Sequence, residues 1–127
     1  MCYDIIKPKG VLLMCTKNEL SVILKEIAET AKDTFKDKLD SVILYGSYAR
    51  GDYHKDSDID IMILVKGIPS EDLWKYRAPI TEKSSEMGLE YDILITPLIK
   101  DVDTFKKYLN VLPFYQNVDK EGIRIGA

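Results

Sequence analysis

The chain has 127 residues, of which 46% are hydrophobic and 31% are charged. This length and apolar content suit one domain with a core of its own. The 18 Lys and Arg residues against 21 Asp and Glu residues give a net charge of −3, which excludes a strongly basic nucleic-acid module. We therefore expect no nucleic-acid binding.

Two further classes of protein are excluded by the residue content. No apolar stretch approaches the ~20 residues that a membrane span needs. The two cysteines, Cys2 and Cys15, are too few for a disulfide framework or a four-ligand zinc site, and His54 is the one histidine. Metal chemistry in this chain would therefore use oxygen ligands, and we expect a cytoplasmic protein in a reducing compartment.

The first residues do not resemble an export signal, because Val11–Cys15 supply only five apolar residues. Met14 stands directly before Thr16, which with Glu19 three residues later forms a capping box at the start of a helix. We therefore expect residues 1–15 to be a disordered leader and residues 16–127 to form the domain. The alternative is that translation starts at Met14, so that residues 1–13 are not translated.

Hydrophobic periodicity then predicts helices and strands in alternation. The pattern indicates a helix from Thr16 to about Lys36–Lys38, a strand Leu39–Tyr45, a helical turn Ala49–Gly51, a strand Asp58–Val65, a helix Ser70–Met87 broken near Pro79, a strand Leu89–Thr96, a helix from Asp101 or Asp103 through Leu109, and a turn-like tail 113–127 with a last strand over 122–125. This order predicts a single α/β layer domain.

Two acidic side chains lie inside the second apolar strand. Asp58 and Asp60 are two residues apart, so strand alternation places both on one face, while Ile59, Ile61 and Ile63 occupy the other. Neighbouring carboxylates raise each other's pKa unless a cation lies between them. Oxygen ligands at this spacing suit Mg²⁺.

A third acid follows in the next predicted strand. Asp92 lies within Leu89–Thr96, and if the two strands are neighbours three carboxylates converge at one edge of the sheet. They could then hold a second metal ion. Glu90 shares a face with Asp92, so spacing alone does not decide between the two.

Gly46 and Ser47 follow the first strand directly. Glycine permits a tight turn, and Ser47 offers a hydroxyl and a backbone N–H at the start of a short helix, where phosphates are often held. A helix cap is the alternative role for Ser47. Arg50 is equally suited to contacting a phosphate or to bracing Asp52 or Asp56. We expect His54 to be an exposed loop residue.

The stretch GSYARGDYHKDSDIDIMILV resembles the G-S-x10-D-x-D signature of the DNA polymerase β-like nucleotidyltransferase superfamily. It is most similar to the minimal nucleotidyltransferase family, which includes antitoxins encoded beside HEPN-domain proteins. The segment Tyr91-Asp92-Ile93 fits that family's third acid. The resemblance implies a mixed β-sheet packed with helices.

The resemblance also implies an activity, the Mg²⁺-dependent transfer of a nucleoside monophosphate, AMP from ATP, to a hydroxyl. Asp58, Asp60 and Asp92 would be the catalytic and metal-binding residues, and Gly46 and Ser47, with Arg50, would bind the nucleotide. Larger relatives carry an acceptor domain for which this chain has no room, so the acceptor would belong to a second polypeptide such as a HEPN partner. The alternative is a binding module that neutralises a HEPN-type toxin by occlusion. The donor nucleotide, the acceptor and any homo-oligomer remain open.

Overall fold

A four-stranded sheet forms the centre of the computed structural model, which describes residues 17–125. The strand order is β3-β2-β1-β4, with β2 and β3 parallel and the other pairs antiparallel. The strands are β1 Leu39–Tyr45, β2 Ile59–Val65, β3 Ile95–Asp101 and β4 Ile123–Ile125. The expected mixed sheet is therefore confirmed, with β2 in its interior and β3 at one edge.

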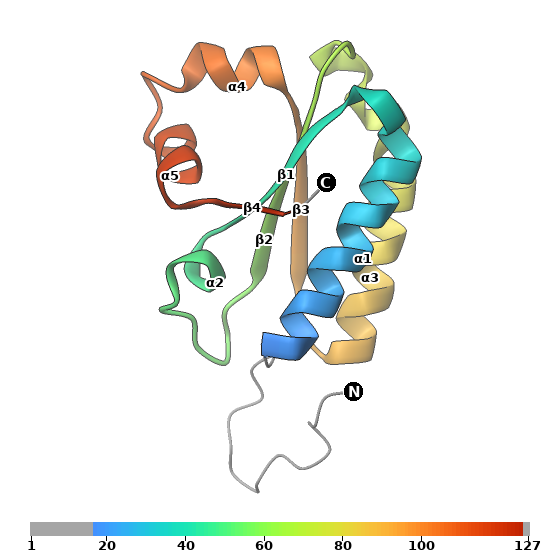
Figure 1. The fold of residues 1–127 in the computed structure, drawn as a ribbon, viewed down its shortest axis with the longest axis vertical. Coiled ribbons are helices and arrows are strands. Elements are labelled where there is room, and N and C mark those ends of the chain that lie inside the picture. Colours follow the sequence, from blue (N-terminus) through green and yellow to red (C-terminus); the bar gives the residue numbers. More distant parts are fainter. Residues whose placement is uncertain (1–16, 126–127) are drawn as a thin grey trace, which may run out of the picture.

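Helices cover both faces of this sheet (Figure 1). The helical segments are α1 Lys17–Phe35, the 3-10 turn Lys36–Lys38, α2 Ser47–Arg50, the 3-10 segment Ser70–Tyr76, α3 Arg77–Tyr91, α4 Val102–Tyr108 and α5 Pro113–Glu121. The long helices α1 and α3 pack on one face, and α4 and α5 pack on the other. No helix in the described part of the chain is long and apolar enough to cross a membrane.

Strand β2 supplies side chains to both cores. Ile59, Ile61 and Ile63 are fully buried in the core under α1 and α3, as their alternation predicts. Met62 and Leu64 are buried in the second core, under α4 and α5. Asp60 points to the same face as Met62 and is only half-buried. The acidic pair therefore lies where the second core gives way to solvent.

Most of the predicted elements are confirmed between Lys17 and Asp101. Helix α1 buries Ile23, Ile27, Ala28, Ala31 and Phe35, β1 has the predicted bounds, and β2 begins one residue later than expected. The helical turn after Gly46 ends at Gly51 in a left-handed conformation. The proposed leader and the Thr16 cap lie outside the described residues.

The predicted strand Leu89–Thr96 is wrong. Helix α3 continues to Tyr91 and is capped by Asp92 in the left-handed conformation, so β3 begins only at Ile95. Gly88 does not stop the helix; its carbonyl accepts from the Ile93 N–H at 3.0 Å, and a Cβ at Gly88 would lie 2.8 Å from the Ile93 carbonyl oxygen. The glycine is needed for this close approach in the final helical turn.

Two smaller expectations are also corrected. Ser70 opens a 3-10 segment rather than a long helix, and its hydroxyl donates to Asp101 instead of capping the backbone. Residues after Leu112 form α5, with Pro113 in its first turn and Tyr115 and Val118 buried, where a turn-like tail was expected. The last strand, by contrast, is confirmed as β4.

Candidate functional site

The end of β1 and the start of β2 meet at one point of the sheet. In the antiparallel register Tyr45 pairs with Asp60, so the chain turns into Gly46 and Ser47 directly beside that carboxylate. The order along β1 and β2 therefore brings the Gly-Ser pair to the acidic pair, although ten residues separate Ser47 from Asp58 in the sequence. The Gly-Ser and Asp-x-Asp parts of the motif therefore lie next to each other in the structure.

Gly46 is required at this meeting point for two separate reasons. Its φ of +78° lies in the region that favours glycine, and a Cβ built on it would collide with the Asp60 Oδ2 atom. Its carbonyl accepts from the N–H groups of Ala49 at 3.1 Å and Arg50 at 3.0 Å, which holds the first turn of α2. The absence of a side chain at Gly46 thus lets α2 begin against the Asp60 carboxylate, with Ser47 as its first residue.

The acidic pair carries negative charge that its surroundings only partly balance. Burial raises the pKa of Asp60, the charge of Asp58 raises it further, and Arg50 opposes both effects. Burial and the Asp60 charge together raise the pKa of Tyr45 to about 12. A cation between Asp58 and Asp60 would relieve this repulsion, and carboxylate oxygens are the ligands that Mg²⁺ prefers. The donor set therefore fits a magnesium ion.

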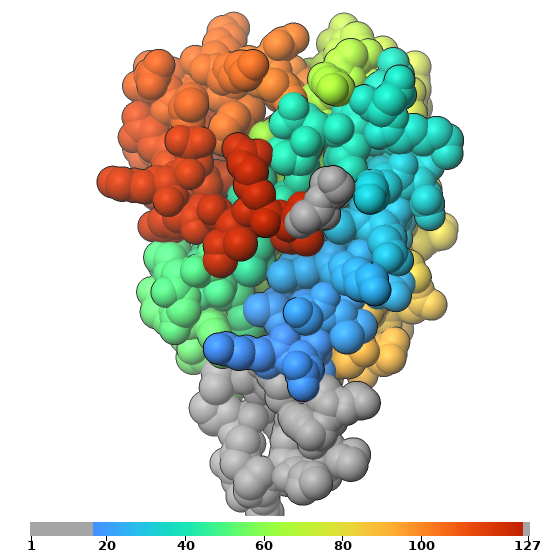
Figure 2. All heavy atoms as spheres, viewed as in Figure 1, coloured from blue at the N-terminus to red at the C-terminus, as the bar shows by residue number. Residues whose placement is uncertain are grey.

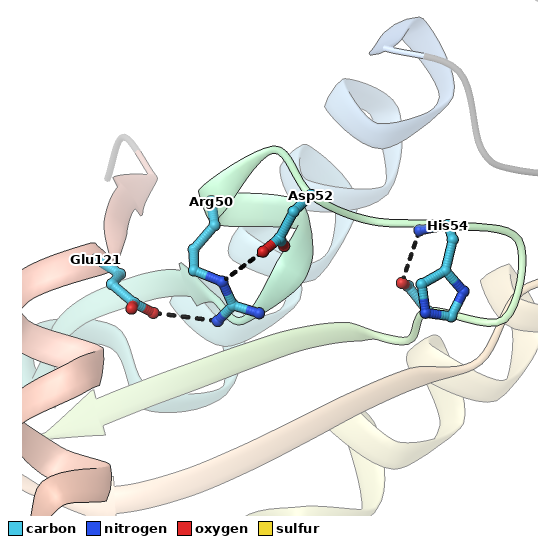
Figure 3. A network of polar contacts seen from close by, with 5 residues as sticks. Arg50, Asp52, His54 and Glu121 are labelled. Atoms are coloured by element: carbon cyan, nitrogen blue, oxygen red, sulfur yellow. Dashed lines mark hydrogen bonds and ion pairs between the residues drawn. The ribbon is translucent and has the colours of Figure 1, made fainter.

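Arg50 braces two other carboxylates. Its Nε donates to Asp52 Oδ2 at 3.1 Å, and its Nη1 donates to Glu121 Oε1 at 3.2 Å (Figure 3). The Glu121 contact ties α2 to the end of α5, and the space-filling view shows the segment around α2 directly beneath α5 (Figure 2). Of the two braces considered, the one to Asp52 is confirmed. Phosphate contact by Arg50 stays a prediction.

The loop between α2 and β2 is held by its own polar groups. The His54 N–H donates to Ser57 Oγ at 2.9 Å (Figure 3). The Asp56 N–H donates to His54 Nδ1 at 3.2 Å. His54 is exposed, as expected, and it organises the turn that leads into Asp58. The ring stack of Tyr48 on Tyr53, with centroids 4.3 Å apart, fixes the other end of this loop on α2.

Asp92 does not join the acidic pair. It is an exposed residue at the C-terminal end of α3, and Glu90 is exposed on the same helix. Between residues 17 and 125 no group of three His, Cys, Asp or Glu side chains is placed to hold a metal ion. The expected convergence of three carboxylates is therefore not found, and a metal-binding role for Asp92 remains a prediction without a position to support it.

Two residues near the site were missed in the sequence. Tyr45 was assigned only to a buried strand, and the signal that reveals it is the β1–β2 register, which pairs it with Asp60. Glu121 lies 71 residues from Arg50 in the chain, so no local pattern could have connected them.

Comparisons with known proteins found a matching family and several similar proteins. The model of the nucleotidyltransferase domain family matches residues 24–121. A protein of Methanocaldococcus jannaschii named "Putative protein adenylyltransferase MJ0141" is 41% identical over 107 residues, which cover 84% of this chain and 99% of that protein. A second protein of the same organism, named "Putative protein adenylyltransferase MJ0604", is 32% identical over 99 residues, which cover 78% of this chain and 90% of that protein.

Solved structures share the fold at lower sequence identity. A crystal structure described as "a putative nucleotidyltransferase from Sulfolobus solfataricus" has a TM-score of 0.55 and 24% identity, covering 93% of this chain and 89% of that one. A toxin–antitoxin structure with AMP-PNP has a TM-score of 0.52 and 23% identity, with coverage of 82% and 73%. At these identities the likeness concerns the fold alone.

Proposed function

Because the chain belongs to the nucleotidyltransferase domain family and is a transferase of that kind, we propose that it transfers AMP from ATP to a hydroxyl group, with Asp58 and Asp60 holding a Mg²⁺ ion. In this reaction the acceptor oxygen forms a bond to the α-phosphorus, and the bond from that phosphorus to the bridging oxygen breaks, releasing pyrophosphate. The observation that carries the proposal is the packing of Gly46 against the Asp60 carboxylate, with Asp58 close enough for its charge to act on Asp60.

Each residue of the site then has a physical task. Asp58 and Asp60 hold the cation, which when bound offsets triphosphate charge and lowers the pKa of the acceptor hydroxyl. Gly46 allows the donor phosphates to approach the backbone, and the Ser47 hydroxyl and N–H position the phosphates that leave. Arg50, fixed between Asp52 and Glu121, holds α2 in place for that contact.

The donor and the acceptor are inferred with different support. The relatives are named as protein adenylyltransferases, which favours AMP as the transferred group and a protein as the acceptor. A fold neighbour is a toxin–antitoxin structure with AMP-PNP. We propose a hydroxyl on a partner protein of the HEPN class as the acceptor, because the stretch GSYARGDYHKDSDIDIMILV resembles that of antitoxins encoded beside such proteins.

The proposal is tested by titrating the purified chain with ATP, with and without Mg²⁺, in a calorimeter. We expect Mg²⁺-dependent binding that weakens at least tenfold in Asp58→Asn, because that variant loses one of two charged ligands. Asp56→Asn is the matched control, since Asp56 is an exposed loop residue two positions away, and it should bind like the wild type. Equal binding by Asp58→Asn and the wild type would contradict the metal site.

Transfer itself is followed with ATP labelled at the α-phosphate and, in parallel, at the γ-phosphate. Label should appear on the partner protein only from the α-labelled donor, since pyrophosphate carries the γ-phosphate away. Label from the γ position would instead indicate a kinase reaction and would exclude nucleotidyl transfer.

A second candidate, a binding module that neutralises a toxin by occlusion, is favoured by one observation: the described residues bring together two carboxylates rather than three. The two functions separate in cells that express the partner. Occlusion predicts that Asp60→Asn still protects these cells, whereas protection by AMP transfer is lost in that variant.

A further inference from the structure

The strand next to Asp60 carries a residue that the sequence motif does not include. Strand β3 runs parallel to β2, and its register pairs Ile59 with Ile95 and Asp60 with Thr96. Partners in register on adjacent strands direct their side chains to the same face of a sheet. Thr96 therefore lies beside Asp60, on the face that also carries Asp58.

Burial along β3 supports this assignment of faces. Ile95 is buried in the core under α1 and α3, together with Ile59 and Ile61 of β2. Leu98 packs with Met62 in the other core, under α4 and α5. Thr96 lies one residue after Ile95 and two before Leu98, so it is on the sheet face that carries Leu98 and Met62. Its side chain is exposed. It therefore faces the open end of the sheet where the acidic pair lies.

In the same register Asp92 does not lie opposite Asp60. Asp92 comes before the strand begins, and it lines a different hollow, one formed by α3 and the segment that follows it, together with Ser84, Ser85 and Gly88. The position on β3 opposite Asp60 is thus filled by the neutral side chain of Thr96.

We propose that Thr96, not Asp92, is the third side chain of this site, facing the cation that Asp58 and Asp60 hold. The inference rests on the proposed function for the identity of the cation, and it adds that the site has one negative charge fewer than a three-carboxylate site. Two consequences follow. The cation binds weakly until a triphosphate supplies further oxygens. In addition, β3 offers no carboxylate beside Asp60 to accept the proton of the acceptor hydroxyl, because its one acidic residue, Asp101, pairs with Val65 at the other end of β2.

The test is to restore the missing carboxylate and to measure cation binding without nucleotide. In Thr96→Asp, a third carboxylate beside Asp60 should tighten Mn²⁺ binding at least tenfold by calorimetry. The matched control is Ser85→Asp, which adds the same charge at an exposed position beside Asp92 and should leave Mn²⁺ affinity unchanged. The gain should disappear in the double variant Thr96→Asp with Asp60→Asn, because the added ligand then lacks its partner.

Several outcomes would overturn the inference. One is a Thr96→Asp variant that binds Mn²⁺ as the wild type does; another is a gain that survives Asp60→Asn. A loss of Mn²⁺ affinity in Asp92→Asn, or a gain in Ser85→Asp, would place the cation at the end of α3. If Thr96→Asp does not fold by circular dichroism, Thr96→Glu serves as the second variant with the same expected gain.

These measurements need neither ATP nor an acceptor, so they separate the two levels of the proposal. Suppose that the chain does not bind Mg²⁺-ATP, but Thr96→Asp raises the Mn²⁺ affinity and this increase depends on Asp60. The proposed function is then contradicted, and the place of Thr96 beside the cation is supported. If ATP binds with Asp58-dependent affinity and Thr96→Asp has no effect, the proposed function stands and the inference about Thr96 falls.

Discussion

Two junctions of the same sheet behave differently. At the β1–β2 junction, Gly46, Ser47, Asp58 and Asp60 come together as their spacing predicts. At the α3–β3 junction, the predicted strand is the last turn of a helix, and Asp92 caps it. The first junction is built from an antiparallel strand pair joined by α2 and the loop that follows it, and the faces of both strands follow from local alternation. The second junction depends on the residue at which α3 ends, and the local sequence predicts the end of a helix less accurately.

The difference has a physical origin in the glycines. Gly46 must be glycine because both its φ and the Asp60 carboxylate demand it. Gly88 looks like a helix stop in the sequence, yet it serves the close approach of the Ile93 carbonyl inside the last turn. The same residue type therefore marks a turn at one junction and a backbone contact at the other.

The largest expected effect at the first junction comes from Gly46→Ala. The new Cβ collides with the Asp60 carboxylate, and the alanine is held at a strained φ. We therefore expect the free energy of unfolding to fall by about 2–4 kcal/mol. Mg²⁺-dependent ATP binding should also be lost. Thermal unfolding and calorimetry measure both effects.

Gly51→Ala is the matched control for that variant. Its φ of +87° is similarly strained, but nothing lies within 4 Å of its Cβ. We expect a cost of about 1–2 kcal/mol with ATP binding retained. Equal losses in the two variants would contradict the contact between Gly46 and Asp60.

The next effect concerns Asp60 and the cation. At 100 times its dissociation constant, Mg²⁺ should stabilise the wild type by about 2.7 kcal/mol, and Asp60→Asn should lose most of that stabilisation. Melting curves at rising Mg²⁺ concentration check this expectation, and equal shifts in the two proteins would contradict it.

The pH dependence of the cation-free protein gives an independent check. Because the pKa of Asp60 is raised in the folded state, its ionised form costs stability above that pKa. Asp60→Asn should therefore be at least as stable as the wild type at pH 7. The difference between the two should shrink as the pH falls through the folded-state pKa of Asp60, and it should vanish below the unfolded-state pKa. A variant that is less stable than the wild type at pH 7 would contradict the raised pKa.

A smaller effect of opposite sign is expected at the second junction. Asp92 has a φ of +54°, which glycine adopts without strain. Asp92→Gly should therefore raise stability by about 0.5–1 kcal/mol and leave cation binding unchanged. A variant with weakened Mn²⁺ binding would restore the original assignment of Asp92 to the metal site.

The smallest effect belongs to Arg50. Its pairs with Asp52 and Glu121 are partly exposed, so Arg50→Ala should lower the free energy of unfolding only slightly. Glu121→Gln removes one of the two pairs and should cost less. If Arg50 also contacts phosphate, Arg50→Ala weakens ATP binding while Glu121→Gln does not, and calorimetry separates the two.

Sequence alone determined much of this molecule, for identifiable reasons. The burial of Ile59, Ile61 and Ile63 follows from strict alternation, and the stripe of α1 from helical periodicity. Helix α5 was missed because its apolar residues are few and Pro113 favours a turn as much as a helix start. Thr96 could not be found at all, because only the pairing of β2 with β3 brings it to Asp60.

The most direct test of the cation site is a Mn²⁺ titration followed in the amide NMR spectrum of the labelled chain, since the ion broadens the signals nearest to it. We predict that the signals of Gly46, Asp60 and Thr96 vanish at the lowest Mn²⁺ concentrations, before those of Gly88 and Asp92. Early loss of the Asp92 and Gly88 signals, with Gly46 still sharp, would contradict a cation held by Asp58 and Asp60.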